Sequence, residues 1–279
     1  MQAPLRWTRV KPWALTALGI CLAGVYLFPV YWMVISGLKS SSEIFSIPPT
    51  FFPMAPSLAS YRWVLERENV LRYLFNSFIV AGGSTVLTLA LGSGTAYALA
   101  RVRSNWMDAM LVTIMVSQVL PPALLVTPMF VIFKQLGLLN SHLGVILAIT
   151  TKTLPFAVVM LRTTFAQIPP ELEEAARVDG ASRVGAFFRV VMPLARIGYI
   201  VVGTIVFLLA YGEFVYPVSL LSKATLQPAT VGLYGFVGAD YADWPNAMVF
   251  ATIIVAPVLL LFLVFQRRIV AGLTAGALK

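Results

Sequence analysis

Long apolar stretches, separated by short charged segments, dominate the chain. A helix needs about 20 mostly apolar residues to cross the hydrocarbon core of a bilayer. Four stretches without any charged residue reach this length, at 12–38, 73–100, 109–133 and 244–266. Two more qualify if Lys152 and Glu213 are accepted inside them and Arg162 near the end of one. We therefore predict an all-α integral membrane protein with six transmembrane helices, at about 13–36, 73–100, 109–133, 143–164, 197–220 and 244–266.

Prolines and glycines modify this pattern. Residues 44–61 and 224–239 also lack charged residues, but both contain several prolines or glycines. Because proline removes an amide donor and breaks helical pairing, we expect both to be irregular loops with short helical pieces. Pro121 and Pro122 predict a kink in the third span, and Pro155 predicts one in the fourth.

Composition excludes several classes of protein. Apolar residues make up 59% of the 279 residues, and charged residues make up 11%, against about 25% in a typical soluble domain. The mean hydropathy is +0.87. An ordinary soluble enzyme, a disordered protein and a nucleic-acid-binding domain are therefore excluded. A single cysteine and a single histidine exclude a disulfide framework and a metal site built on those residues.

The net charge of +9 predicts the orientation in the membrane. Cytoplasmic loops of membrane proteins carry an excess of Lys and Arg. Basic residues gather before the first span, after the second, after the fourth and behind the sixth. With six spans these four segments share one face, so we expect both termini to be cytoplasmic. The predicted organisation is a cytoplasmic N-terminus at 1–12, a transmembrane domain at 13–266 with a long cytoplasmic loop at 165–196, and a cytoplasmic tail at 267–279.

The loop at 165–196 has the pattern of helix, tight turn and helix. Pro169 and Pro170 are suited to opening a helix, since the first amides need no partner there. Gly180 is suited to the left-handed turn that ends one. Ser182 can cap a second helix at 183–192, which Pro193 would close. From these features alone the loop is either a solvated amphipathic segment or a knob that docks into a partner protein.

The same loop carries a specific resemblance. The residues Glu174, Ala175, Ala176, Gly180, Val190, Met192 and Pro193 are similar to the E-A-A-x3-G-x9-I-x-L-P signature of permeases of ABC importers. The longer stretch at 168–182 resembles the maltose-type carbohydrate permeases in particular. Residues 76–80, 96–101, 120–122, 136–140 and 267–277 resemble the same family, so the likeness covers nearly the whole chain.

This resemblance implies a set of partners. The chain would be one half of a heterodimeric membrane channel, with a second permease subunit, two ATPase subunits on the cytoplasmic side and an extracytoplasmic solute-binding protein. It would lie in the bacterial inner membrane and import a sugar of the maltose or trehalose type. The sequence contains no G-x-x-x-x-G-K-[ST] phosphate loop. We therefore expect ATP and Mg²⁺ to bind the ATPase, and this chain to hold no cofactor and to be no enzyme itself.

The resemblance also implies which residues meet the ATPase. The helix at 171–182 would be the coupling helix, and Glu174 would pair with a basic residue of the ATPase. The expected coupling residues are Glu173, Glu174, Ala175, Ala176, Asp179, Gly180, Ala181 and Ser182. Tail residues that would reach between the ATPase subunits are Gly272, Leu273, Thr274 and Gly276.

Charged residues within a span are costly and usually face a cavity or a partner. Glu213 follows Tyr211 and Gly212 where the family usually has Trp and Asn before the acid. One interpretation places Glu213, Tyr211 and Lys152 along the translocation path. The other, which we favour, pairs Glu213 with Lys152 or with the second permease to fix helix packing.

Other functions remain alternatives at this stage. A secondary transporter should show an internal repeat and several intramembrane acids, neither of which is visible. A membrane-embedded metalloprotease needs clustered histidine and acidic ligands, which one histidine cannot supply. Within the importer class, a glycerol phosphate or a polyol is the alternative substrate, and Lys152 alone gives little support for a phosphate ester.

Overall fold

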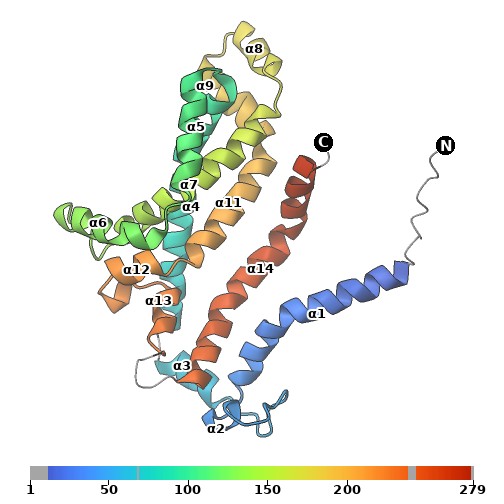
Figure 1. The fold of residues 1–279 in the computed structure, drawn as a ribbon, viewed down its shortest axis with the longest axis vertical. Coiled ribbons are helices and arrows are strands. Elements are labelled where there is room, and N and C mark those ends of the chain that lie inside the picture. Colours follow the sequence, from blue (N-terminus) through green and yellow to red (C-terminus); the bar gives the residue numbers. More distant parts are fainter. Residues whose placement is uncertain (1–11, 68, 238–242, 278–279) are drawn as a thin grey trace. The chain divides into compact units, whose positions relative to one another are not determined.

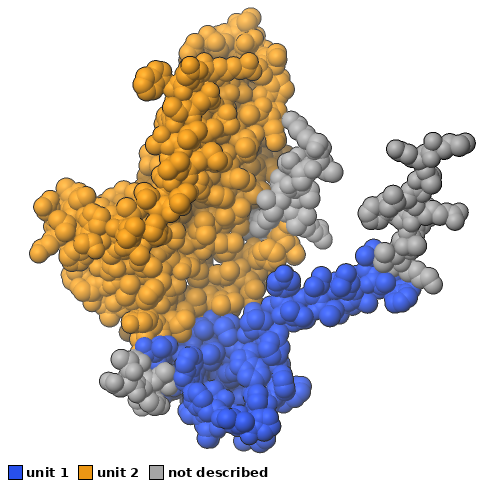
Figure 2. Space-filling view, viewed as in Figure 1, with its two compact units in different colours: residues 1–68, 236–253 blue, residues 69–235, 254–279 orange. Residues whose placement is uncertain are grey.

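The structure is a computed structural model that describes residues 12–67, 69–237 and 243–277. Every regular element in these ranges is helical. The chain divides into two compact units, one of residues 1–68 with 236–253 and one of residues 69–235 with 254–279 (Figure 2). The first contains α1 (Pro12–Ser36), α2 (Ser41–Ile44), α3 (Ala59–Arg67) and the start of α14 (Trp244–Ala277) (Figure 1).

The first unit combines an exposed apolar helix with an irregular segment. Large side chains of α1 are exposed, including Tyr26 at 80%. The segment that follows α1 is held by polar contacts. Buried Lys39 donates to the carbonyl of Thr50, and its ammonium lies 4.6 Å from the centre of the Trp32 ring. Glu43 accepts the amide of Met54 at 2.7 Å. Residues 44–61 are irregular apart from short helical pieces, as the sequence predicted.

Three helices form the core of the second unit. They are α4 (Val70–Arg101), α7 (His142–Ala166) and α11 (Arg196–Tyr211), and their small residues allow close packing. A hydrogen bond of 2.8 Å joins the hydroxyls of Thr88 and Thr153, and one of 2.7 Å joins Tyr199 to Ser93. These polar bridges and a cluster of buried apolar side chains hold α4, α7 and α11 together.

Two predicted spans are broken rather than continuous. The stretch at 109–133 forms α5 (Asn105–Ser117) and α6 (Pro122–Gln135), which meet at 98°. The prolines at 121 and 122 fall at this break, where the expectation was a kink within one helix. The stretch at 197–220 forms α11 and α12 (Val215–Leu220), with a break at 212–214. The prediction of one helix over each stretch was therefore wrong.

In the part of the chain that the structure describes, four helices could cross a membrane by length and composition, and up to six could if each bent helix pair counts as one span. The second of these pairs joins residues 183–194 to α11 at 77°. The short elements η2 (Ala224–Leu226) and α13 (Ala229–Tyr234) lie in the loop expected at 224–239. Helix α14 continues to Ala277, so no helix end marks the predicted start of the tail at 267. The contacts predicted for the tail residues lie outside the described part of the chain; these residues are Gly272, Leu273, Thr274 and Gly276.

Candidate functional site

The loop at 165–196 contains the helix and tight turn that its sequence predicts. Helix α8 (Glu171–Val178) begins directly after Pro170. Gly180 has φ +91°, a left-handed conformation that glycine adopts without steric cost. The amide of Gly180 donates to Arg177 at 3.1 Å, and the amide of Ala181 donates to Ala176 at 2.9 Å. This pair of bonds is the Schellman motif that ends many helices.

The second helical segment starts at Ser182, whose hydroxyl accepts the amide of Gly185 at 3.0 Å. It consists of α9 (Arg183–Ala186), a π-helical turn η1 (Phe187–Val191) and α10 (Met192–Leu194). We expected the helix to end at 192, before Pro193. It continues through Leu194, because Pro193 lies in the first turn of α10, where no amide donor is needed.

Helix α8 has one face turned outward and one turned inward. Glu174 and Ala175 are exposed, as is Leu172, and Val178 is 88% exposed. Apolar side chains exposed together in this way commonly mark a protein interface. Glu173, between Leu172 and Glu174, is buried. The helix therefore presents an acidic and apolar surface outward and directs one carboxylate into the protein.

The carboxylate of Glu173 is bound from α4. The Nε of Arg101 donates to it at 2.6 Å, its Nη2 forms an ion pair with it, and the hydroxyl of Tyr97 donates to it. Sequence reasoning placed Glu173 among the residues that meet the ATPase. In this structure the carboxylate is instead bound by these internal partners.

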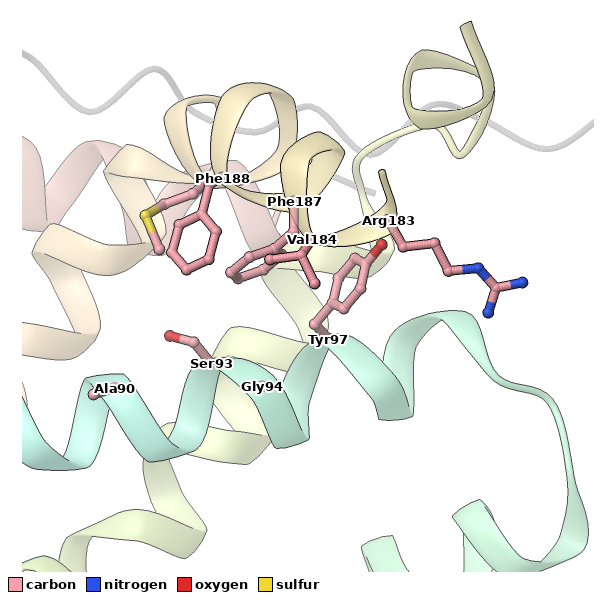
Figure 3. A pocket seen from close by; sticks show the side chains of 9 residues that line it. Ala90, Ser93, Gly94, Tyr97, Arg183, Val184, Phe187 and Phe188 are labelled. Carbon is pink, nitrogen blue, oxygen red and sulfur yellow. The ribbon is translucent and has the colours of Figure 1, made fainter. Parts of the chain in front are cut away.

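An apolar cavity of about 480 Å³ separates α4 from the second helical segment (Figure 3). The rings of Phe187 and Phe188 lie on one side of it, and Ser93 and Gly94 of α4 lie on the other. At its edge the ring centres of Tyr97 and Phe187 are 4.8 Å apart. Helix α4 thus contacts α8 through polar side chains and η1 through apolar and aromatic side chains beside this cavity.

The second candidate site is an ion pair at the break between α11 and α12. The Nζ of Lys152, on α7, lies 2.5 Å from Oε2 of Glu213. The other carboxylate oxygen accepts the amide of Val215 at 3.0 Å. The side chain of Glu213 is 3% exposed and that of Lys152 is 36% exposed. The pairing that we favoured is confirmed.

Tyr211 belongs to the packing of the helices rather than to an open surface. It is buried, and its hydroxyl donates to the carbonyl of Ile254 at 3.1 Å. Its ring stacks on Phe207 and meets Phe78 edge-on. Its assignment to the translocation path stays a prediction, and in this structure its side chain is covered by neighbouring helices of the same chain. Of the three predicted path residues, Lys152 alone is substantially exposed.

A family model spans both candidate sites. Residues 88–274 match the family described as the inner membrane component of binding-protein-dependent transport systems. The chain belongs to this family. The permease is also similar along nearly its whole length to characterised transport proteins.

Two relatives illustrate this similarity. A permease protein of a sulfoquinovosyl glycerol transport system from Agrobacterium fabrum is 38% identical over 269 residues, which are 96% of this permease and 94% of the relative. A permease protein of a trehalose transport system from Mycobacterium tuberculosis is 32% identical, over 97% of this permease and 98% of the relative. Both alignments are long enough to include the loop at 165–196 and the ion pair of Lys152 with Glu213.

Solved structures share the fold. A chain of a bacterial ABC transporter involved in import of the acidic polysaccharide alginate superposes with a TM-score of 0.76 at 19% identity. The match covers 96% of this permease and 99% of that chain. The fold is therefore that of a permease of an ABC importer.

Sequence reasoning missed the roles of Tyr97 and Arg101. Both were noted as part of the stretch that closes the second span, without a partner being assigned to either. A usable signal was present, because residues four apart share one face of a helix. Tyr97 and Arg101 can therefore reach the same group, although the sequence does not show which group that is.

Proposed function

We propose that this permease is one half of the transmembrane channel of an ATP-driven sugar importer. It would work with a second permease subunit, two ATPase subunits and an extracytoplasmic solute-binding protein. The observation that carries the proposal is the outward face of α8, which is exposed, acidic and apolar on a permease of this family. This chain would bind neither ATP nor Mg²⁺ and would hydrolyse nothing itself.

In this proposal α8 is the coupling helix, which seats in a cleft of one ATPase. Glu174 is exposed at its first turn and would pair with a basic residue of that subunit. Ala175 and Val178 would provide the apolar contact, and Gly180 would provide the turn. The remaining predicted residues, Ala176, Asp179, Ala181 and Ser182, would shape the same contact. The tail at 267–279 would reach between the ATPase subunits.

This assignment fixes the proposed orientation. The loop at 165–196 and both termini would be cytoplasmic, and the loop that follows α1 would be external. Most of the basic residues then lie on the cytoplasmic side, as the positive-inside rule requires. The exposed apolar surface of α1 would face lipid and the second permease.

We propose a neutral di- or oligosaccharide as the substrate. The trehalose system of one relative named above supports this class, because trehalose is a neutral disaccharide. The sulfoquinovosyl glycerol system of the other relative takes a sugar glycoside that carries a sulfonate group. Lys152 would face the translocation path, since a partly exposed charge within a span avoids lipid. Because Glu213 neutralises Lys152, the pair offers hydrogen-bond donors for hydroxyl groups rather than the net positive charge that would favour a phosphate ester.

Coupling is tested by changing Glu174 to alanine in the importer reconstituted with its partners. We expect substrate-loaded binding protein to stop stimulating ATP hydrolysis, while the permease still inserts into the membrane. Glu66→Ala is the matched control, because it removes an exposed carboxylate on α3, in the proposed external loop. Full stimulation in Glu174→Ala would contradict the role of α8.

The same vesicles test the substrate class. With its binding protein present, the importer should take up a labelled neutral disaccharide in preference to glycerol phosphate. Uptake of the phosphate ester alone would contradict the proposed substrate without affecting the role of α8.

A further inference from the structure

We propose that Arg101 is a positioning residue that holds the coupling helix α8 against α4. Through this contact, movement of the ATPase would be transmitted to α4 and α7 together. This inference rests on the proposed role of α8. It concerns a contact inside the permease, between helices that the chain itself does not join directly.

The guanidinium of Arg101 binds three groups at once. Besides Glu173, it donates through Nη1 to the carbonyl of Phe165 and through Nη2 to that of Ile168, each at 3.0 Å. The carbonyl of Phe165 lies in the last turn of α7, which ends at Ala166, and that of Ile168 lies two residues beyond it. Carbonyls at a helix end lack partners within the helix, and a cation there is favourable. One side chain of α4 thus joins the end of α7 to the start of α8.

Tyr97 reinforces this junction from one helical turn earlier in α4. Its hydroxyl donates to Glu173, and its ring packs on Phe187 of the second helical segment. Glu173 is only 7% exposed. A carboxylate buried to this degree is costly without its partners. Helix α8 therefore cannot swing away from α4 unless Glu173 reaches water or new donors.

The loop also reaches α4 indirectly, because α7 and α11, to which the chain joins it, both pack on α4. The chain connects α8 to α7 through residues 167–170, and it connects α10 to α11 through Ala195. Between α4 and η1 lies the apolar cavity of Figure 3. The contact of Arg101 and Tyr97 with Glu173 is the polar link that joins α4 to α8 directly.

This link is tested by measuring the amount of sugar transported per ATP hydrolysed, in the importer reconstituted with its binding protein. We expect Arg101→Gln to lower this ratio about tenfold, within the usual range of coupling between sites. Arg101→Lys keeps a positive charge beside Glu173 and should lower this ratio less than Arg101→Gln does. Arg103→Gln removes an exposed charge two residues away and should leave the ratio unchanged.

A double variant separates this role from general destabilisation. If Arg101 acts through Glu173, then Arg101→Gln combined with Glu173→Gln should be no worse than the more severe single variant. If the two changes caused independent structural defects, their effects on the transport ratio would multiply. That result would overturn the proposal. If Arg101→Gln fails to assemble, Tyr97→Phe removes a single hydroxyl from the junction and should still lower the ratio measurably.

The outcomes distinguish this inference from the proposed function. Loss of stimulation in Glu174→Ala, together with a normal ratio in Arg101→Gln or, if that variant does not assemble, in Tyr97→Phe, would overturn the link alone. Normal behaviour of both the Glu174 and the junction variants would overturn the coupling role of α8 as well.

Discussion

At the scale of single residues, the two ion pairs of the second unit differ in how far water reaches them. Arg101 and Glu173 are both largely buried, with side-chain exposures of 18% and 9%. In the other pair only Glu213 is buried, while Lys152 is partly open. Removing one partner of a buried pair is costly because it leaves a charge without compensation. The cost should therefore depend on which residue of the Lys152–Glu213 pair is removed.

Lys152→Met should be the more damaging change, because it leaves the carboxylate of Glu213 buried and unpaired, at about 3–5 kcal/mol. Glu213→Gln should cost less, since the ammonium of Lys152 can reach water. The thermal unfolding midpoint of the purified importer measures both effects. The double variant Lys152→Met, Glu213→Gln should recover part of the loss. Failure to recover would show that the two residues stabilise the permease separately.

The sequence predicts which residues belong to these sites better than it predicts which way their side chains point. Gly180 and Ser182 have local roles, a turn and a cap, and both were predicted correctly from residue type. Glu173 and Glu174 are adjacent and chemically identical, so the pattern alone could not show which faces inward. Only the position of Arg101, distant in sequence, decides this.

At the scale of elements, small residues set the spacing of α7 and α11. A Cβ added at Gly198 would lie 2.5 Å from atoms of Thr164. Thr164 is β-branched and restricted in χ1, so it cannot move aside easily. A Cβ added at Gly82, on α4, would meet nothing within 4 Å in the described part of the structure.

Gly198→Ala should therefore destabilise the permease by about 1–3 kcal/mol, the usual cost of overpacking. Gly82→Ala is the matched control and should be neutral or slightly stabilising, because alanine is the better helix former. Unfolding of the two variants in detergent gives the comparison. Equal stability of both would show that α7 and α11 separate without cost.

Helix breaks were harder to predict than helices. Hydrophobic length located α4 and α7 within three residues at each end. Hydrophobic length did not predict the break at 212–214. There the helix ends just before Gly212 and Glu213, although the residues on both sides are equally apolar. There the buried carboxylate is stabilised by Lys152 and by the amide of Val215. These are tertiary and local contacts that an apolar pattern does not encode.

At the scale of the whole molecule, the distribution of charge and of exposed apolar side chains bears on the orientation and the partners. Val178, an exposed apolar residue of α8, lies in a segment with several arginines. Ile47, 96% exposed, lies in the loop that follows α1. If the proposed orientation holds, these two residues face opposite sides of the membrane.

The most direct test of the account is photo-cross-linking in native membranes, with a photoreactive residue at position 178 or at position 47. The account predicts a covalent adduct with the ATPase subunit from position 178 and none with that subunit from position 47. An ATPase adduct from position 47, or none from position 178, would contradict both the docking of α8 and the orientation of the permease.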